Sequence, residues 1–137
     1  MKLISFFSIE PFECQTKQAF GKKGVIETPN YPKHYPNNAD CTWLIETPAE
    51  FTEIRIHLVQ FNVENVRWSK LCIKDSLEVF QYRGLQKEKR GRYCGKHTGK
   101  EFKVYGNKVE FRFQSNQYRG RKGFRIEWEA VKGQLQI

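Results

Sequence analysis

The sequence has little of what catalytic and membrane proteins need. It holds one methionine and three histidines, His34, His57 and His97, and none of these has a partner four residues away as in a helical metal site. No cysteine pair has CxxC spacing, and no serine lies in a nucleophile-elbow setting. No stretch approaches the ~20 apolar residues of a membrane-spanning helix. We therefore predict a protein that is not an enzyme and has no transmembrane segment.

Four cysteines are the first informative feature that is present. Between Cys14 and Cys41 lie 26 residues, and between Cys72 and Cys94 lie 21. Such spacings suit long-range disulfides between strands, which are typical of secreted proteins, although four cysteines allow three pairings. Each bond would contribute about 3 kcal/mol by loop closure. The sequence predicts a secreted, disulfide-stabilised domain.

Apolar and polar residues alternate with a period of two between turn signals, as in half-buried strands. In segments 109–113 and 124–128, the charged residues would face water and every second residue would face a core. These core-facing residues are Val109, Phe111, Phe113, Phe124, Ile126 and Trp128. The clearest strands are 42–45, 54–58, 77–80, 109–113 and 124–128. Many short strands without a long amphipathic helix predict an all-β, antiparallel β-sandwich.

An ordered series of motifs carries a family resemblance. The motifs are 24–32 (GVIETPNYP), 35–38 (YPNN), 41–43 (CTW), 61–64 (FNVE), 72–75 (CIKD), 91–95 (GRYCG), 113–116 (FQSN) and 123–124 (GF). From Cys14 to about Ala130 the chain resembles a CUB domain, so we expect the domain at 14–130, an N-terminal extension or truncated leader at 1–13 and a C-terminal tail at 131–137.

The resemblance implies a fold and a class of function. CUB domains are jelly-roll-like β-sandwiches with sequential disulfides, here Cys14 with Cys41 and Cys72 with Cys94. They are extracellular interaction modules, found in complement proteases, tolloid-type astacins, neuropilins and spermadhesins, and the family itself is not catalytic. We therefore expect a secreted module that binds an extracellular partner.

The resemblance also implies a calcium site. The family's ligand positions correspond to Glu64, Asp75 and Asn116, with Tyr35 orienting the carboxylates. The third ligand is a carboxylate in many members and an amide here, which removes one charge although an amide oxygen can still bind calcium. The alternative is that Glu64 and Asp75 pair with basic neighbours such as Lys74.

Positive charge is concentrated in one part of the chain. The net charge is −2 over residues 1–66, +12 over 67–125 and −1 over 126–137. Two basic clusters, 87–92 and 119–122, lie in the central segment, and we expect them at opposite ends of the sandwich. Lys108, Arg112 and Arg125 could join them into a stripe that suits a long polyanion.

Because the aromatic residues of these strands fall on the buried phase and the disulfides indicate an extracellular protein, we expect no nucleic acid partner. A sulfated glycosaminoglycan or an acidic protein surface is the better candidate, and charge that only keeps the domain soluble is the alternative. The predicted partner-binding residues are Lys87, Lys89, Arg90, Arg92, Arg119, Arg121, Lys122, Tyr118 and Trp68, with Tyr82 as a further aromatic candidate.

Two other functions stay open at this point. One is a calcium-dependent protein-binding site, in which a lysine of the partner reaches the same carboxylates. The other is an accessory domain that positions substrates for a secreted multidomain protease.

Overall fold

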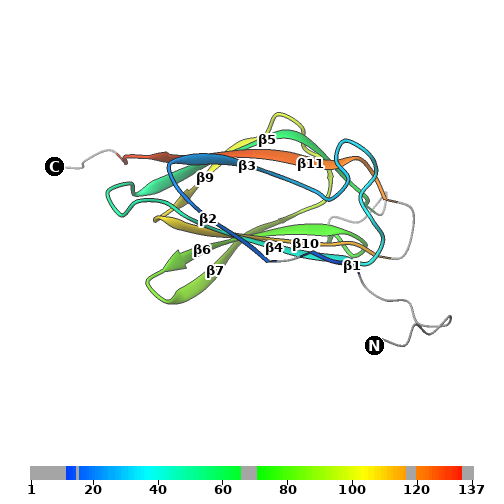
Figure 1. Ribbon diagram of the computed structural model, residues 1–137, viewed down its shortest axis with the longest axis horizontal. Helices are drawn as coiled ribbons and strands as arrows, with labels where there is room; N and C mark the ends of the chain where they lie inside the picture. Colours follow the sequence, from blue (N-terminus) through cyan, green and yellow to red (C-terminus); the bar gives the residue numbers. More distant parts are fainter. Residues whose placement is uncertain (1–11, 15, 66–70, 117–119, 134–137) are drawn as a thin grey trace, which may run out of the picture.

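The protein folds as two β-sheets stacked face to face (Figure 1). The structure, a computed structural model, describes residues 12–14, 16–65, 71–116 and 120–133, and no helix occurs in these ranges. All five strands predicted from the alternation are present. The expected antiparallel sandwich is therefore confirmed.

The six-stranded sheet forms the lower layer of Figure 1, in the order β1-β4-β10-β6-β7, with β2 also pairing with β4. The two N-terminal strands run parallel to β4, and the other pairings are antiparallel. The strands are β1 (Phe12–Glu13), β2 (Lys17–Phe20), β4 (Ala39–Glu46), β6 (Ser76–Arg83), β7 (Gln86–Tyr93) and β10 (Lys108–Gln114).

The five-stranded sheet forms the upper layer, in the order β3-β11-β5-β8, with β9 also pairing with β5. All its pairings are antiparallel; β11 lies between β3 and β5, and β5 pairs with β11, β8 and β9. The strands are β3 (Lys23–Glu27), β5 (Glu53–Val63), β8 (Gly95–Lys96), β9 (Glu101–Tyr105) and β11 (Gly123–Val131).

The core between the sheets is built around Phe124 of β11. Its ring lies 5.7 Å from Trp43 and 5.5 Å from Phe113 of the opposite sheet, both edge to face, and stacks 6.0 Å from Phe61 of its own sheet. Such aromatic pairs contribute roughly 0.5–1.5 kcal/mol each beyond their buried area. All six residues predicted to face the core are buried, namely Val109, Phe111, Phe113, Phe124, Ile126 and Trp128.

Both predicted disulfides are present. Cys14 pairs with Cys41, which fastens the start of the chain to β4, and Cys72 pairs with Cys94, which fastens the β5–β6 loop to the end of β7. The two disulfides therefore constrain one loop and one end of the chain.

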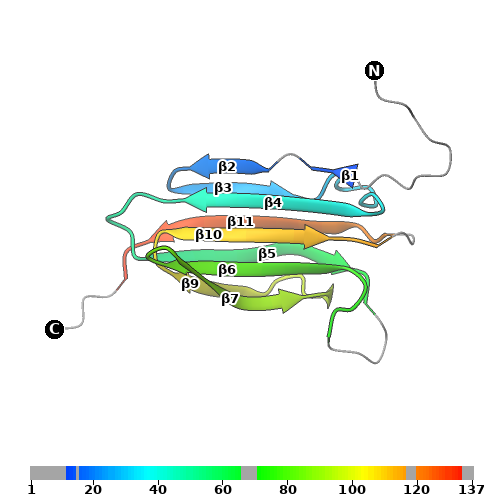
Figure 2. The ribbon, with the colours of Figure 1, turned by 90° about the horizontal axis from the view of Figure 1, so that it is seen from below.

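The chain enters and leaves the sandwich at opposite ends of its long axis (Figures 1 and 2). β1 pairs with Ala39–Asp40 at the end where the β3–β4, β5–β6 and β10–β11 loops meet, which we call the loop end. β11 finishes beside Glu53 at the other end. The described segments include no helix of the length and hydrophobicity that a membrane span needs.

The tight packing of the loop end can be tested by substituting Gly123, the first residue of β11. Its φ is 87°, and a Cβ would come within 2.0 Å of the Oγ1 of buried Thr28, which accepts a hydrogen bond from Phe124 N. We expect Gly123→Ala to lower the free energy of unfolding by about 2–4 kcal/mol, because backbone strain and a steric clash add together. Gly99 has a φ of 91° and open space around it. Gly99→Ala should therefore cost only about 1–2 kcal/mol, and equal losses in urea denaturation would contradict the clash.

Candidate functional site

The loop end brings together the residues that the sequence predicted as metal ligands. Tyr35 comes from the β3–β4 loop, Glu64 and Asp75 come from the two ends of the β5–β6 loop, and Asn116 follows β10. Their side chains and backbone are joined by a continuous set of hydrogen bonds.

The hydroxyl of Tyr35 is the centre of this set. It donates to Asp75 Oδ2 and accepts from the backbone N–H of Glu64 over 3.0 Å. The Tyr35 ring is buried, with its edge on Phe113 at 4.9 Å. A Cβ on Gly120 would lie 2.7 Å from this ring, so the β10–β11 loop can pass over Tyr35 only with glycine at that position.

Asp75 is fully buried, and both of its oxygens are occupied. Asn116 N donates to Oδ1 over 2.8 Å, and Tyr35 donates to Oδ2. Burial raises the pKa of the Asp75 carboxyl, and the two hydrogen bonds only partly offset this effect. Burial, with the hydrogen bond to Asp75, raises the pKa of Tyr35 far above its usual range, so its hydroxyl stays protonated and donates.

The raised pKa of Asp75 has a direct consequence for stability. The folded domain binds a proton at Asp75 more readily than the unfolded chain, so the ionised carboxylate contributes unfavourably at pH values above the raised pKa. That unfavourable contribution is what a bound cation would offset.

Glu64 and Asn116 complete the cluster. Asn116 Nδ2 donates to Glu64 Oε1 over 3.3 Å, and Glu64 is buried at 8% exposure. In the described part of the chain, no lysine or arginine forms an ion pair with Glu64 or Asp75. Although burial raises the pKa of the Asp75 carboxyl, Lys74 still acts on it electrostatically in the opposite direction. Arg67 and Lys70 lie outside the described residues, so pairing with basic neighbours stays a prediction.

The chemistry of this cluster suits a hard, oxygen-binding cation. Two carboxylates and an amide converge, and calcium takes six to eight oxygen ligands of these types. The described residues include no group of three His, Cys, Asp or Glu side chains placed to hold a metal, because the third member is Asn116. The residues fit calcium with a reduced ligand charge.

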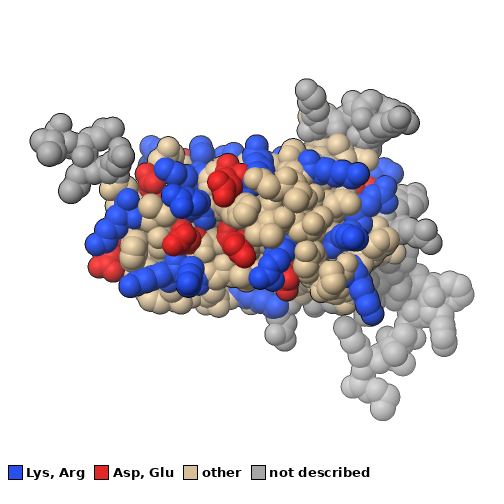
Figure 3. Space-filling model, turned by 90° about the horizontal axis from the view of Figure 1, so that it is seen from above, with Lys and Arg blue, Asp and Glu red and all other residues tan. Residues whose placement is uncertain are grey.

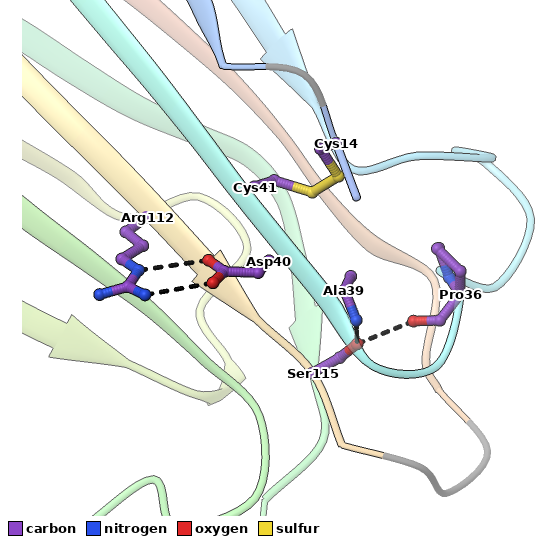
Figure 4. Close-up of a disulfide and its surroundings, with 7 residues drawn as sticks. All are labelled: Cys14, Pro36, Ala39, Asp40, Cys41, Arg112 and Ser115. Carbon is purple, nitrogen blue, oxygen red and sulfur yellow. Dashed lines mark hydrogen bonds and ion pairs between the residues drawn. A yellow bond between two sulfur atoms is a disulfide. The ribbon is translucent and has the colours of Figure 1, made fainter. Parts of the chain in front are cut away.

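Ser115 anchors the loop end and was not among the predicted site residues. Its hydroxyl donates to Pro36 O and accepts from Ala39 N, each over 2.8 Å (Figure 4). Beside it lie the Cys14–Cys41 disulfide and a two-point ion pair between Arg112 and Asp40. Tyr35 directly precedes Pro36, and Asn116 directly follows Ser115. Ser115 therefore fixes how the β3–β4 loop meets the end of β10.

Two of the predicted partner-binding lysines are engaged by carboxylates of their own sheet. Lys87 lies 3.1 Å from Glu110, which also accepts from the hydroxyl of Tyr82, and Lys89 lies 2.6 Å from Glu78. Both glutamates are largely buried, with side chains 13% and 12% exposed. These lysines neutralise local negative charge.

The two arginines of β7 point to different places. Arg90 reaches the other sheet, where it donates to Lys103 O and lies over the ring of Tyr105. Arg92 donates to Cys72 O at the loop end. The cluster 87–92 therefore runs along β7 toward the loop end, which differs from the expectation that it occupies the opposite end of the sandwich.

The expected basic stripe does not form through Lys108, Arg112 and Arg125. The first two lie on β10 of the six-stranded sheet, whereas Arg125 lies on β11 of the other sheet, so they face opposite sides of the molecule. Figure 3 looks onto the outer face of the five-stranded sheet and shows basic and acidic side chains interspersed. On this face, Arg125 pairs with Glu27 over 2.9 Å.

Arg121 and Lys122 are exposed at the loop end, and neither forms an ion pair with another described residue. Tyr35 N donates to the backbone carbonyl of Arg121, so this segment is fixed to the centre of the site. Trp68, Tyr118 and Arg119 lie outside the described residues.

The histidines have separate structural settings. His34 is exposed in the β3–β4 loop, His57 lies on the outer sheet face 3.9 Å from Glu101, and His97 packs against the rings of Phe61 and Tyr93. All four cysteines are in disulfides. The described residues thus offer no assembled nucleophile and base.

The Tyr35 hydroxyl can be tested by removing it alone. Tyr35→Phe leaves the buried N–H of Glu64 and one oxygen of Asp75 without their partner, so we expect the free energy of unfolding to fall by about 1–3 kcal/mol. Tyr31 lies in the same loop, and its hydroxyl has no hydrogen bond with the described residues. Tyr31→Phe should be nearly neutral in urea denaturation, and equal effects of the two changes would contradict the role of the Tyr35 hydroxyl.

Solved structures share this arrangement of sheets. The CUB1-EGF-CUB2 region of human MASP-1/3 superposes with a TM-score of 0.75 at 22% identity, covering 88% of this chain and 43% of that one. The MASP-1 CUB2 domain bound to Ca²⁺ gives a TM-score of 0.71 at 20% identity, covering 83% and 97%. At these identities the likeness shows the fold.

Similar sequences occur in long proteins. Cubilin from Sus scrofa is 30% identical over 125 residues, which cover 87% of this chain and 3% of cubilin. Tolloid-like protein 1 from Homo sapiens is 34% identical over 113 residues, covering 82% and 11%. The chain therefore spans only a small fraction of the length of the relatives it matches.

A family model described as the CUB domain matches residues 14–128, nearly the whole described sandwich with both disulfides. Together with the two-sheet fold, this match shows that the chain belongs to the CUB domain family, a family of non-catalytic interaction modules.

Proposed function

We propose that this domain is an extracellular binding module that contacts a protein partner through its loop end, organised by calcium held by Glu64, Asp75 and Asn116. The observation that carries the proposal is the convergence of two carboxylates and an amide in one hydrogen-bonded cluster. Tyr35 orients the site through Asp75 and the backbone of Glu64.

Calcium would supply positive charge that offsets the cost of burying these two carboxylates. Two carboxylates give a modest ligand charge, which favours the weak, 10⁻⁴–10⁻³ M class of calcium affinity seen in extracellular modules. The MASP-1 CUB2 domain, solved with Ca²⁺, supports a cation at this type of fold. A lysine of the partner could then approach the site from the loop end, where Glu64 keeps 8% exposure and Asp75 is fully buried.

The extracellular location is part of the proposal. Two disulfides and no free cysteine are typical of proteins that fold in an oxidising compartment. If the domain is part of a longer secreted protein, as its relatives are, the loop end is the surface that would position a partner or substrate for the other domains.

The calcium site predicts opposite effects of two single changes. In calorimetric titration, Glu64→Gln should abolish the saturable heat of calcium binding, because it removes one of two carboxylates. Asn116→Asp should tighten binding several-fold, since affinity rises with ligand charge. The same variant should melt at a lower temperature than wild type in chelator, because it loses the bond to Glu64 and adds like charge, and at a higher temperature in millimolar calcium.

Glu110→Gln serves as the control, because it removes a carboxylate of similar burial from the outer sheet face. It should leave the heat of calcium binding unchanged. Absence of heat in both wild type and Asn116→Asp would exclude calcium at this site, and loss of heat in the control would show that binding is not local.

A second function, recognition of a sulfated polyanion, is favoured by Arg121 and Lys122. Both are exposed at the loop end without a described ion-pair partner, and Arg92 lies at the same end. Guanidinium and ammonium groups bind sulfate by charge-assisted hydrogen bonds, and such binding weakens with salt. Arg119 belongs to the same segment by sequence.

Heparin chromatography tests this second function. We expect wild type to elute from heparin at higher salt than from a plain sulfonate exchanger, and Arg121→Glu with Lys122→Glu should remove that difference. Lys23→Glu with Lys132→Glu makes the same charge change at the opposite end and should preserve it. Identical elution of the two double variants would show that only net charge matters.

A further inference from the structure

The second strand of the β6–β7 hairpin lies on the surface of the six-stranded sheet. None of the eight residues of β7 is buried. The turn that precedes it presents Leu85 fully to solvent. Removing such a strand from the sheet exposes little apolar surface, so its local opening costs far less than global unfolding.

β7 is also an edge strand with an irregularity. It pairs only with β6, and the pairing passes from Val79 with Gly91 directly to Phe80 with Lys89. Arg90 is therefore the extra residue of a β-bulge and has no partner opposite it. The backbone around the Arg90–Gly91 bond is thus hydrogen-bonded to β6 alone and has no described strand at its outer edge.

The sequence at this bulge is Lys87-Glu88-Lys89-Arg90-Gly91. Secreted serine endoproteases that cleave after paired basic residues bind a substrate as an extended strand and seat its basic side chains in acidic pockets. Here basic side chains stand at the first, second and fourth positions before the bond, and a glycine without a side chain follows it. We propose that the Arg90–Gly91 bond is a processing site for a protease of this class.

Ion pairs hold the recognition side chains in the intact sheet. Lys87 pairs with Glu110 and Lys89 with Glu78, while Arg90 donates to Lys103 O. The lysine ends of both pairs are about half exposed, at 45% and 50%. Such pairs contribute little to stability, so a protease can compete for these side chains. They set the rate of cleavage and do not prevent it.

Cleavage would leave the domain in one covalent piece. Hydrolysis of the Arg90–Gly91 amide consumes one water and leaves a carboxylate on Arg90 and an ammonium group on Gly91. Cys72 and Cys94 lie on opposite sides of this bond and are joined by a disulfide. The product is therefore a two-chain domain in which residues 87–90 are released from the ladder.

This inference rests on the proposed extracellular location, but its test with purified components does not. The folded 137-residue chain is incubated with a purified furin-type endoprotease. We expect two bands on a reducing gel, the smaller beginning at Gly91, and one species on a non-reducing gel. Arg90→Gln should abolish cleavage, and Arg121→Gln, which breaks the basic pair Arg121–Lys122, should not affect it.

Glu78→Gln tests whether the ion pair of Lys89 in the folded sheet slows cleavage. It frees Lys89 from its ion pair and should raise the cleavage rate about two- to five-fold. Intact protein under conditions that fully cut a peptide of residues 83–94 would overturn the proposal, and so would cleavage at another bond or only after denaturation. None of these outcomes depends on calcium binding to Asn116→Asp, so this proposal and the proposed function fail separately.

Discussion

The hydroxyl of Tyr35 is the contact on which the loop end depends. One O–H group meets a side chain at the far end of the β5–β6 loop and a backbone N–H at its near end, so it closes that loop across the molecule. The backbone of Tyr35 meets the β10–β11 loop, and Gly120 leaves room for its ring. Leaving this buried hydroxyl without its two partners would be costly. The β3–β4, β5–β6 and β10–β11 loops are therefore expected to form and open together.

Net charge alone gives a misleading picture of this surface. The +9 total suggests a polyanion site, but several cations on the outer sheet faces form ion pairs with carboxylates of neighbouring strands, as Lys89 does with Glu78 and Arg125 with Glu27. Cross-strand pairing places residues that are far apart in sequence within ion-pair distance. Charge that is available to a partner is therefore concentrated where strands end and loops begin.

The sequence predicts the core strands well, because each sheet has one solvent-exposed face and one buried face, and this makes apolar and polar residues alternate along the strand. It does not predict β7, whose eight residues include no buried side chain and therefore carry no apolar period. The candidate ligands follow from motif positions, whereas the bridge of Ser115 between Pro36 and Ala39 depends on a contact across 79 residues. Which sheet face Arg125 occupies likewise depends on topology, which periodicity does not encode.

The opposite placement of the two chain ends has an architectural consequence. Any segment that precedes Phe12 leaves the sandwich at the loop end, beside the Cys14–Cys41 disulfide, and any segment that follows Val131 leaves at the far end. In a tandem protein, a preceding domain would be joined at the loop end and a following domain at the far end. The domain before this one would then share the loop end with the partner, and the orientation of that neighbour would decide how much of the surface is open.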